Sequence, residues 1–207
     1  MKSVCATKQR LLETVIDLIW EHNYGSVSVD DICRRAKVLK GSFYHFFPSK
    51  ADLAVAALEE RWNKIVRPRL EAIFVPEVAP LDRLAHYCDY IYENQRRQKE
   101  RVGKACGCPF ATIGSEQCTE EEKIRQKSQE TAERYIAFVR QTLEDAARQG
   151  LLDGDTGDLD HRARELYSFV LGMLLQTRIQ DDIEIVRRFK PAFLRLSGVR
   201  REALLAA

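Results

Sequence analysis

The sequence predicts an all-α protein, and three observations support that prediction. Apolar residues recur at helical spacing along most of the 207 residues, and no stretch alternates apolar and polar residues as a half-buried strand would. Ten glycines and six prolines leave long segments uninterrupted. The hydrophobic fraction of 45% suffices for a sizeable core, so we expect a compact helical chain, not a disordered or fibrous one.

The amino-terminal segment has a regular order of helices and turns. An amphipathic helix is expected over residues 7–22, with one apolar face. A short helix follows from Ser28, because Ser28 and Asp31 have the spacing of a capping box. Gly41 then lies in a turn, and residues 42–47 form a second short helix that ends before a proline. The pattern is that of a helix-turn-helix at about residues 28–47, in which the second helix enters the DNA major groove.

Charge is concentrated on this segment. Residues 33–50 contain five Lys or Arg and no Asp or Glu, although the whole chain has a net charge of only +2. A local cluster of cations is typical of a surface that meets phosphates. We therefore predict double-stranded DNA as a partner, contacted by Ser28, Lys37, Lys40, Gly41, Ser42, Tyr44, His45 and Lys50.

The same segment resembles the DNA-binding domain of the TetR family of transcriptional regulators. The matching residues keep the family's spacing over roughly the first 60 positions: Asn23-Tyr24, Ser28, Asp31-Ile32, Ala36, Val38, Gly41-Ser42-Phe43-Tyr44, Phe47, Ser49-Lys50 and Leu53. Four positions depart from it, since Lys37 replaces a frequent glycine, Leu39 a frequent serine, Phe46 a frequent histidine or tyrosine, and Ala51 a frequent acidic residue. The loss of the serine at 39 and of a polar ring group at 46 removes two expected phosphate contacts, and Lys37 offers a replacement for one.

The resemblance implies a domain organisation and a function. Residues 1–50 would form the helix-turn-helix, three-helix DNA-binding domain, and residues 51–207 a helical domain for effector binding and dimerisation. The expected function is sequence-specific transcriptional regulation. The protein would be a repressor that binds a palindromic operator as a homodimer and is released by an unidentified small-molecule effector.

The last part of the chain is expected to carry the dimer interface. Two apolar helices are predicted there, over residues 160–177 and 181–196, and Gly172 permits close approach of another helix. The alternative is that they are simply core. By resemblance we assign the interface to Leu166, Phe169, Val170, Met173, Leu174, Ile185, Val186, Phe189 and Phe193.

The effector pocket is expected among the helices of this domain up to and including the penultimate one, residues 160–177. Its candidates are mostly aromatic, and each also fits an ordinary core position in a helical bundle. By resemblance the candidates are Trp62, Tyr87, Cys88, Ile91, Phe110, Tyr135, Phe138, Tyr167 and Met173.

A Cys-Gly-Cys-Pro motif suggests an alternative, thiol-based function. The run from Gly107 to Phe110, followed by Glu116, resembles a motif found in a subset of TetR-type regulators, some of which respond to electrophiles or oxidants. In that alternative the responding thiols would be Cys106 and Cys108. Arg101 and Lys104 lie nearby in sequence and would favour the thiolate. The competing interpretation is structural: Cys108 is a small buried residue at a helix start, and Cys106 has no chemical role.

Catalysis is the remaining class of function, and the sequence contains no motif that indicates it. No glycine-rich phosphate loop, zinc-protease motif, nucleophile elbow or paired-carboxylate arrangement occurs. We predict no catalytic residue, metal site or cofactor, and keep a helical enzyme only as a remote alternative. No apolar run approaches the roughly 18 residues of a membrane span, and the start lacks a signal peptide. We therefore expect a cytoplasmic protein with reduced cysteines.

Overall fold

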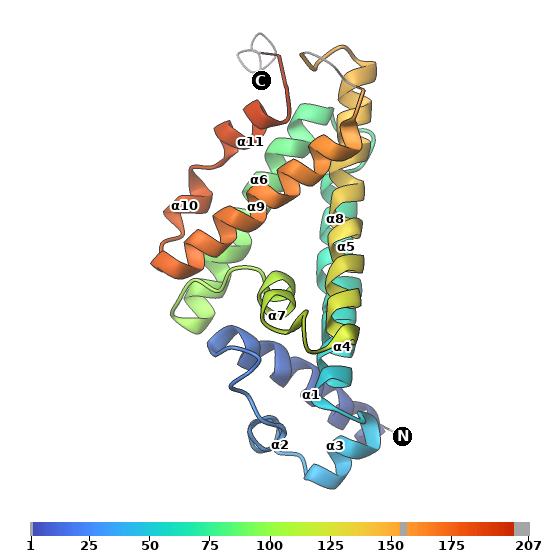
Figure 1. The fold of residues 1–207 in the computed structure, drawn as a ribbon, viewed down its shortest axis with the longest axis vertical. Coiled ribbons are helices and arrows are strands. Elements are labelled where there is room, and N and C mark those ends of the chain that lie inside the picture. Colours follow the sequence, from blue (N-terminus) through green and yellow to red (C-terminus); the bar gives the residue numbers. More distant parts are fainter. Residues whose placement is uncertain (1, 154–156, 201–207) are drawn as a thin grey trace. The chain divides into compact units, whose positions relative to one another are not determined.

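The computed structural model describes residues 2–153 and 157–200, with side chains from residue 6 onward. In this part of the chain the regular structure is helical, which confirms the predicted all-α class (Figure 1). No helix within it is long and apolar enough to cross a membrane. The elements in chain order are α1 (Lys2–Glu21), α2 (Val29–Ala36), α3 (Lys40–Phe46), α4 (Lys50–Arg61), the π-helix η1 (Trp62–Val66), α5 (Arg67–Ile73), α6 (Pro80–Val102), α7 (Pro109–Gln117), α8 (Glu122–Arg148), α9 (Leu159–Gln180), α10 (Glu184–Arg187) and α11 (Lys190–Leu196).

The chain divides into two compact units. The first contains residues 1–67 and 109–131, and the second contains residues 68–108 and 132–207. The unit that contains the helix-turn-helix segment also includes α7 and the first turns of α8. It is therefore built from two segments that are far apart in the sequence. A functional boundary after residue 50 stays a prediction.

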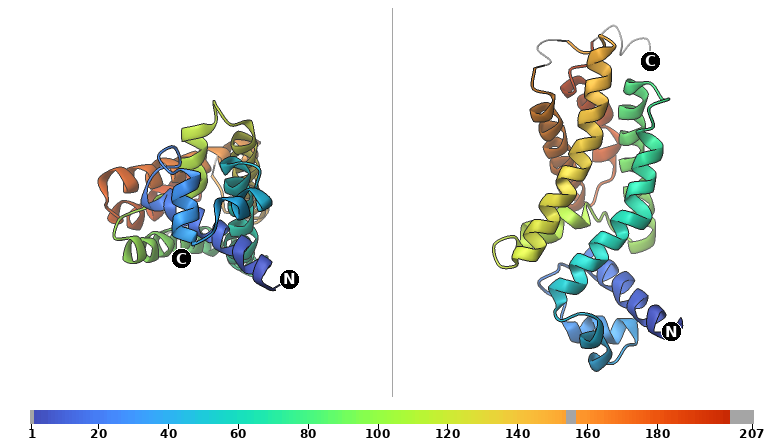
Figure 2. Two further views of the ribbon diagram at one scale, coloured as in Figure 1. Left: turned by 90° about the horizontal axis from the view of Figure 1, so that it is seen from below. Right: turned by 90° about the vertical axis from the view of Figure 1, so that its right-hand side faces the viewer.

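In the first unit α1 packs against α2 and α4 around a core of aliphatic and aromatic side chains (Figures 1 and 2). The predicted apolar face of α1 is buried, since Leu11, Val15 and Ile19 are fully enclosed. Ile32 of α2 and Phe43 of α3 are equally buried. Helix α2 is held by three buried residues, Ile32, Cys33 and Ala36, and α3 by the single buried residue Phe43.

The second unit has an aromatic core that links several helices. The Phe74 ring lies 5.4 Å from the Tyr87 ring of α6 and 5.3 Å from the Phe138 ring of α8, measured between centroids. Tyr87 also contacts Phe193 of α11, at 6.0 Å. In this unit α10 and α11 pack on α6 and α9 (Figures 1 and 2).

Helix continuity is affected at two prolines. The helical run continues past Pro68, because the preceding turn widens to a π-helix in which the Arg67 N–H bonds to the Trp62 carbonyl. The single helix predicted over residues 181–196 is instead two short helices, α10 and α11. Pro191 lies in the first turn of α11, where its missing N–H costs nothing, whereas it would break a longer helix.

Candidate DNA-binding surface

The first helix of the motif is capped as its sequence predicts. The Ser28 hydroxyl accepts a hydrogen bond from the Asp31 N–H at 3.1 Å, and the Asp31 carboxylate accepts one from the Ser28 N–H at 3.0 Å. The hydrogen bonds from Ser28, and then the Arg34 charge, hold the pKa of Asp31 below its ordinary value. This reciprocal cap fixes the entry to α2 and leaves Ser28 exposed.

Lys37 ends α2 in a conformation that favours glycine. Its backbone has φ 54° and ψ 50°, the left-handed region in which a side chain with a Cβ is strained. Its N–H closes the helix onto the carbonyls of Cys33 and Arg34. The side chain is exposed. Glycine would adopt this backbone conformation with less strain, and the lysine side chain makes no contribution to burial.

The second helix turns its apolar residues inward and its polar residues outward. Phe43 and the following Phe47 are buried, and their rings lie 6.3 Å apart. Tyr44 is 50% exposed, with its ring edge against Phe43, and His45 is exposed. Ser42 is half-buried. The helix therefore presents aromatic groups with polar tips to its surroundings.

Gly41 has no structural reason to be glycine. Its φ is not in the left-handed region, and no atom lies within 4 Å of the position that a Cβ would occupy. Glycine inside a helix costs up to about 1 kcal/mol relative to alanine. The absence of a side chain leaves the backbone at Gly41 open to its surroundings.

The cations of the segment have acidic neighbours that the sequence analysis did not consider. The Lys40 ammonium lies 2.8 Å from the Asp30 carboxylate, and that contact raises the pKa of Lys40. Arg35 makes a two-pronged contact with Glu21 of α1, at 2.7 and 3.1 Å. Lys40 is 54% exposed and its pair is a surface pair, so a DNA phosphate could compete for it.

We use the name α3 surface for the exposed residues in and just before this helix. They are Lys37, Leu39, Lys40, Gly41, Tyr44 and His45.

Lys50 has a structural role that its sequence position did not reveal. Its ammonium donates to the carbonyl oxygens of Tyr24 at 3.0 Å and Val27 at 2.9 Å, and it lies 4.0 Å from the centroid of the Tyr24 ring. Burial lowers the pKa of Lys50, against the opposing effect of nearby carboxylates. An ammonium has three hydrogen-bond donors, and these two carbonyls use two of them. Lys50 therefore braces the turn between α1 and α2 from the first residue of α4.

A carboxylate from α7 holds the same turn from its other side. Glu116 accepts hydrogen bonds from the N–H groups of Tyr24 at 2.8 Å and Gly25 at 3.4 Å. Lys123 of α8 adds an ion pair with Asp52 of α4 at 2.6 Å. These contacts join segments far apart in the sequence, which explains why α7 and the start of α8 belong to the first unit.

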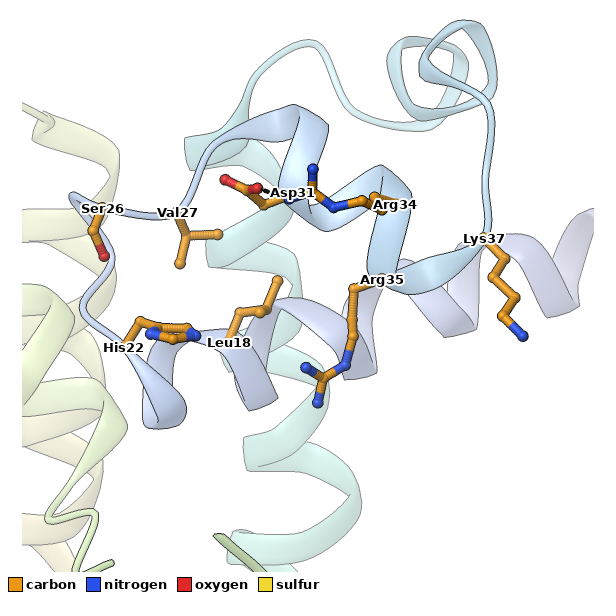
Figure 3. A pocket seen from close by; sticks show the side chains of 8 residues that line it. All are labelled: Leu18, His22, Ser26, Val27, Asp31, Arg34, Arg35 and Lys37. Carbon is orange, nitrogen blue, oxygen red and sulfur yellow. Dashed lines mark hydrogen bonds and ion pairs between the residues drawn. The ribbon is translucent and has the colours of Figure 1, made fainter.

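A groove of about 660 Å³ lies between α1 and α2, on the same unit (Figure 3). Leu18 and His22 line it from α1, and the basic side chains come from the end of α2. Figure 3 shows Arg35 and Lys37 directed toward α1, whereas Arg34 lies along α2 beside Asp31. The basic groups thus extend beyond the α3 surface.

The residues predicted for the dimer interface divide into two groups. Leu166, Val170, Leu174, Val186, Phe189 and Phe193 are at most 8% exposed within the single chain. They lie in the core of the single chain, where little of their surface is left for a second copy, and their assignment to the interface stays a prediction. Phe169, Met173 and Ile185 are half-buried. Helical spacing does not distinguish core from interface, because both are apolar.

The residues predicted for the effector pocket are divided between the two units. Trp62 and Phe110 belong to the first unit and the other seven to the second. Within the second unit the rings of Tyr135 and Tyr167 stack with centroids 6.0 Å apart. Burial raises the pKa of Tyr87, Tyr135 and Tyr167, and the nearby Cys108 contributes to each shift. These three tyrosines are neutral hydrogen-bond donors and acceptors near a thiol.

Cys106 does not have the environment of a reactive thiol. It is 1% exposed, and burial raises its pKa despite the opposing charges of Arg101, Arg178 and Lys104. The expected lowering of this pKa by nearby cations is therefore outweighed by burial. Cys108 is half-buried, and among the cysteines whose side chains are described none forms a disulfide.

Comparisons with known proteins agree with this architecture. Residues 11–57 match the family described as bacterial regulatory proteins, tetR family, and residues 80–193 match the tetracyclin repressor-like C-terminal domain. The chain is similar to the HTH-type transcriptional repressor NemR of Escherichia coli K12, with 29% identity over 178 residues, 86% of this chain and 87% of that protein. It is also similar to the transcriptional regulator AcuR of Cereibacter sphaeroides, with 28% identity over 172 residues, 83% and 76% of the two chains.

Solved structures give the same result. The crystal structure of the reduced form of E. coli NemR superposes with a TM-score of 0.77 at 26% identity, over 91% of this chain and 95% of that one. A regulatory protein TetR from Rhodobacter sphaeroides gives 0.76 at 27% identity, over 92% and 96%.

The fold and the exposed helix-turn-helix define a DNA-binding regulatory protein. The chain belongs to the TetR family, which confirms the resemblance seen in its first 60 residues. It is a DNA-binding transcriptional regulator of the helix-turn-helix repressor type and not an enzyme.

Proposed function

We propose that the α3 surface binds the major groove of a palindromic operator, and that Ser28 and Lys50 contact the flanking phosphates. The observation that carries the proposal is the division of α3, which buries Phe43 and exposes Tyr44 and His45 beside cations. Gly41, free of any packing constraint, permits the close approach that base contacts require.

Selection of duplexes from a random DNA pool tests this proposal. The wild-type protein should enrich one inverted-repeat sequence, and its affinity for that duplex should fall linearly with the logarithm of the salt concentration. Enrichment of no sequence, or an affinity independent of salt, would contradict it.

Lys37→Gly is expected to change stability and DNA binding in opposite directions. Glycine relieves the left-handed backbone and should raise the free energy of unfolding by about 1 kcal/mol. Loss of the ammonium should weaken operator binding and reduce the slope of log affinity against log salt by about 1 per contact. Urea unfolding and fluorescence anisotropy measure the two effects.

Lys37→Asn is the matched control for that experiment. Asparagine tolerates the left-handed region and also lacks the charge, so it should reproduce the loss of affinity. Wild-type affinity and salt slope in both variants would remove Lys37 from the DNA contacts.

We infer that the protein dimerises through an exposed stripe on α9. Ser168, Gly172, Leu175 and Ile179 recur at intervals of four, three and four residues and are all exposed. Leu175 is 57% and Ile179 is 66% exposed, which is unusual for aliphatic side chains so close together. No atom lies within 4 Å of a Cβ built on Gly172, so a second helix could approach there. A dimer places two α3 surfaces on the two half-sites of a palindrome.

We propose that a small molecule binds in the second unit and releases the operator. The support is a cluster of tyrosines, of which Tyr87 is buried and Tyr135 and Tyr167 are half-buried, and which combines aromatic rings with hydroxyl groups and the Cys108 thiol. A ligand acts through its different affinity for the DNA-bound and free conformations. A thermal-shift screen should find compounds that raise the melting temperature and weaken operator binding, and Tyr135→Phe should reduce both effects. We place this activity in the cytoplasm, with the DNA that it binds.

A thiol-based response would have to use Cys108, because Cys106 is buried. Brief treatment with iodoacetamide should label Cys118, which is exposed, and Cys108 at least about tenfold faster than Cys106 and Cys88, since the thiolate is the reactive form. Burial raises the pKa of both slower thiols. Peptide mass spectrometry measures the order of labelling. Fast labelling of Cys106 would restore it as the sensor residue.

A further inference from the structure

Leu39 contributes to the fold neither by burial nor by capping. It is 81% exposed, the largest fraction among the exposed large hydrophobic residues of the described chain. It occupies the N-cap position of α3, with φ −69° and ψ 145°, but its side chain has no oxygen to accept a hydrogen bond. A serine there would be worth about 1 kcal/mol as a cap. The leucine therefore replaces a stabilising residue while remaining outside the core.

The neighbours of Leu39 indicate what it would contact. Lys37 and Lys40 flank it in sequence and both are exposed, as is Gly41 with its open surroundings. An exposed aliphatic group flanked by two cations in sequence suits a polyanionic partner that also presents an apolar group. It is well placed on duplex DNA, where the cations meet phosphates on either side of a groove.

The major groove presents one apolar group on its base edges, the C5-methyl group of thymine. We propose that Leu39 reads the C5-methyl group of a thymine in each operator half-site. The inference rests on the proposed binding of the operator by the α3 surface. It adds a specificity determinant that polar contacts do not supply, because a buried methyl contact discriminates thymine from the other bases through dispersion and desolvation.

Uracil scanning of the operator tests the proposal, since deoxyuridine differs from thymidine only by this methyl group. The operator is the inverted repeat selected by the wild-type protein, and symmetry-related thymines are replaced in pairs. At one pair, the affinity of the wild-type protein should fall about 15-fold, because the loss of one buried methyl group costs about fourfold in each of the two half-sites. Leu39→Ala should bind the thymine and uracil duplexes with equal affinity at that pair. Leu39→Met, which keeps an aliphatic contact, should retain most of the wild-type penalty.

The possible outcomes separate this inference from the function on which it rests. If the wild-type protein tolerates uracil at every thymine, or if Leu39→Ala keeps the penalty, Leu39 does not read a methyl group, although operator binding stands. If no sequence is selected, the proposed function and this inference fail together. Circular dichroism should show Leu39→Ala as folded as the wild type, because the side chain makes no core contact.

Discussion

Replacing Leu175 and Ile179 together with glutamate is expected to convert the protein to a monomer and weaken operator binding by about 100- to 10,000-fold. The two side chains form the apolar part of the α9 stripe, and a dimer would bury four new carboxylates without partners. Each monomer would then bind one half-site without the gain from linkage. Light scattering measures the mass, and anisotropy measures the affinity for palindromic DNA.

Gln149→Glu is the matched control for charge, because it adds an exposed carboxylate at the end of α8. It should leave the mass and the affinity unchanged. A wild-type mass of 23.9 kDa at micromolar concentration, or a dimeric double variant with wild-type affinity, would reject the α9 stripe as the interface.

Lys50→Met is expected to lower the free energy of unfolding by about 2 kcal/mol, because two backbone carbonyls lose a charged donor. It should also weaken operator binding by about 100-fold, because the loss of one phosphate contact in each of the two half-sites costs about 1.4 kcal/mol, or about tenfold, per half-site. Urea unfolding gives the stability, and anisotropy at a temperature where the variant is fully folded gives the affinity.

Lys64→Met provides the control in the same unit. Lys64 is 61% exposed and its ion pair with Glu60 is a surface pair, so the expected change in stability is within about 0.5 kcal/mol. DNA binding should not change. Loss of stability without loss of affinity in Lys50→Met would show that Lys50 only braces the turn.

The sequence predicted the parts of the first unit that depend on local interactions. The Ser28–Asp31 cap joins residues three apart, and the inward position of Phe43 follows from helical periodicity. Such local contacts determine the bends of the helix-turn-helix. The family resemblance can therefore be recognised from the first 60 residues alone.

What the sequence did not predict depends on distant contacts. The Glu116 carboxylate accepts a hydrogen bond from the N–H of Tyr24, which lies 92 positions earlier in the sequence, and no local pattern predicts this pair. The sequence position of Lys50 is compatible with contact to a DNA phosphate or to a backbone carbonyl. Its hydrogen bond to the Tyr24 carbonyl could therefore be recognised only from the structure. Burial likewise reverses the expected shift in the pKa of Cys106, because sequence shows the nearby charges but not the desolvation.

The assignment of apolar residues shows the same limit in the second unit. Leu166 and Leu175 both fit an apolar helix face, yet the first is 1% and the second 57% exposed. The direction of a helix face relative to its neighbours decides which one is core. Periodicity could therefore predict α9 as an amphipathic helix without showing which side remains open to a partner.

Gly41→Leu gives the most direct test of the account, whose central claim is that the α3 surface binds the operator. The position is open, so leucine should fit the free protein and, as a better helix former, leave the free energy of unfolding equal to or about 0.5 kcal/mol above that of the wild type. Between α3 and the DNA the same side chain should obstruct close approach. Anisotropy with the selected operator should show affinity reduced at least about tenfold, or about 1.4 kcal/mol. Wild-type affinity in a folded Gly41→Leu protein would contradict the claim.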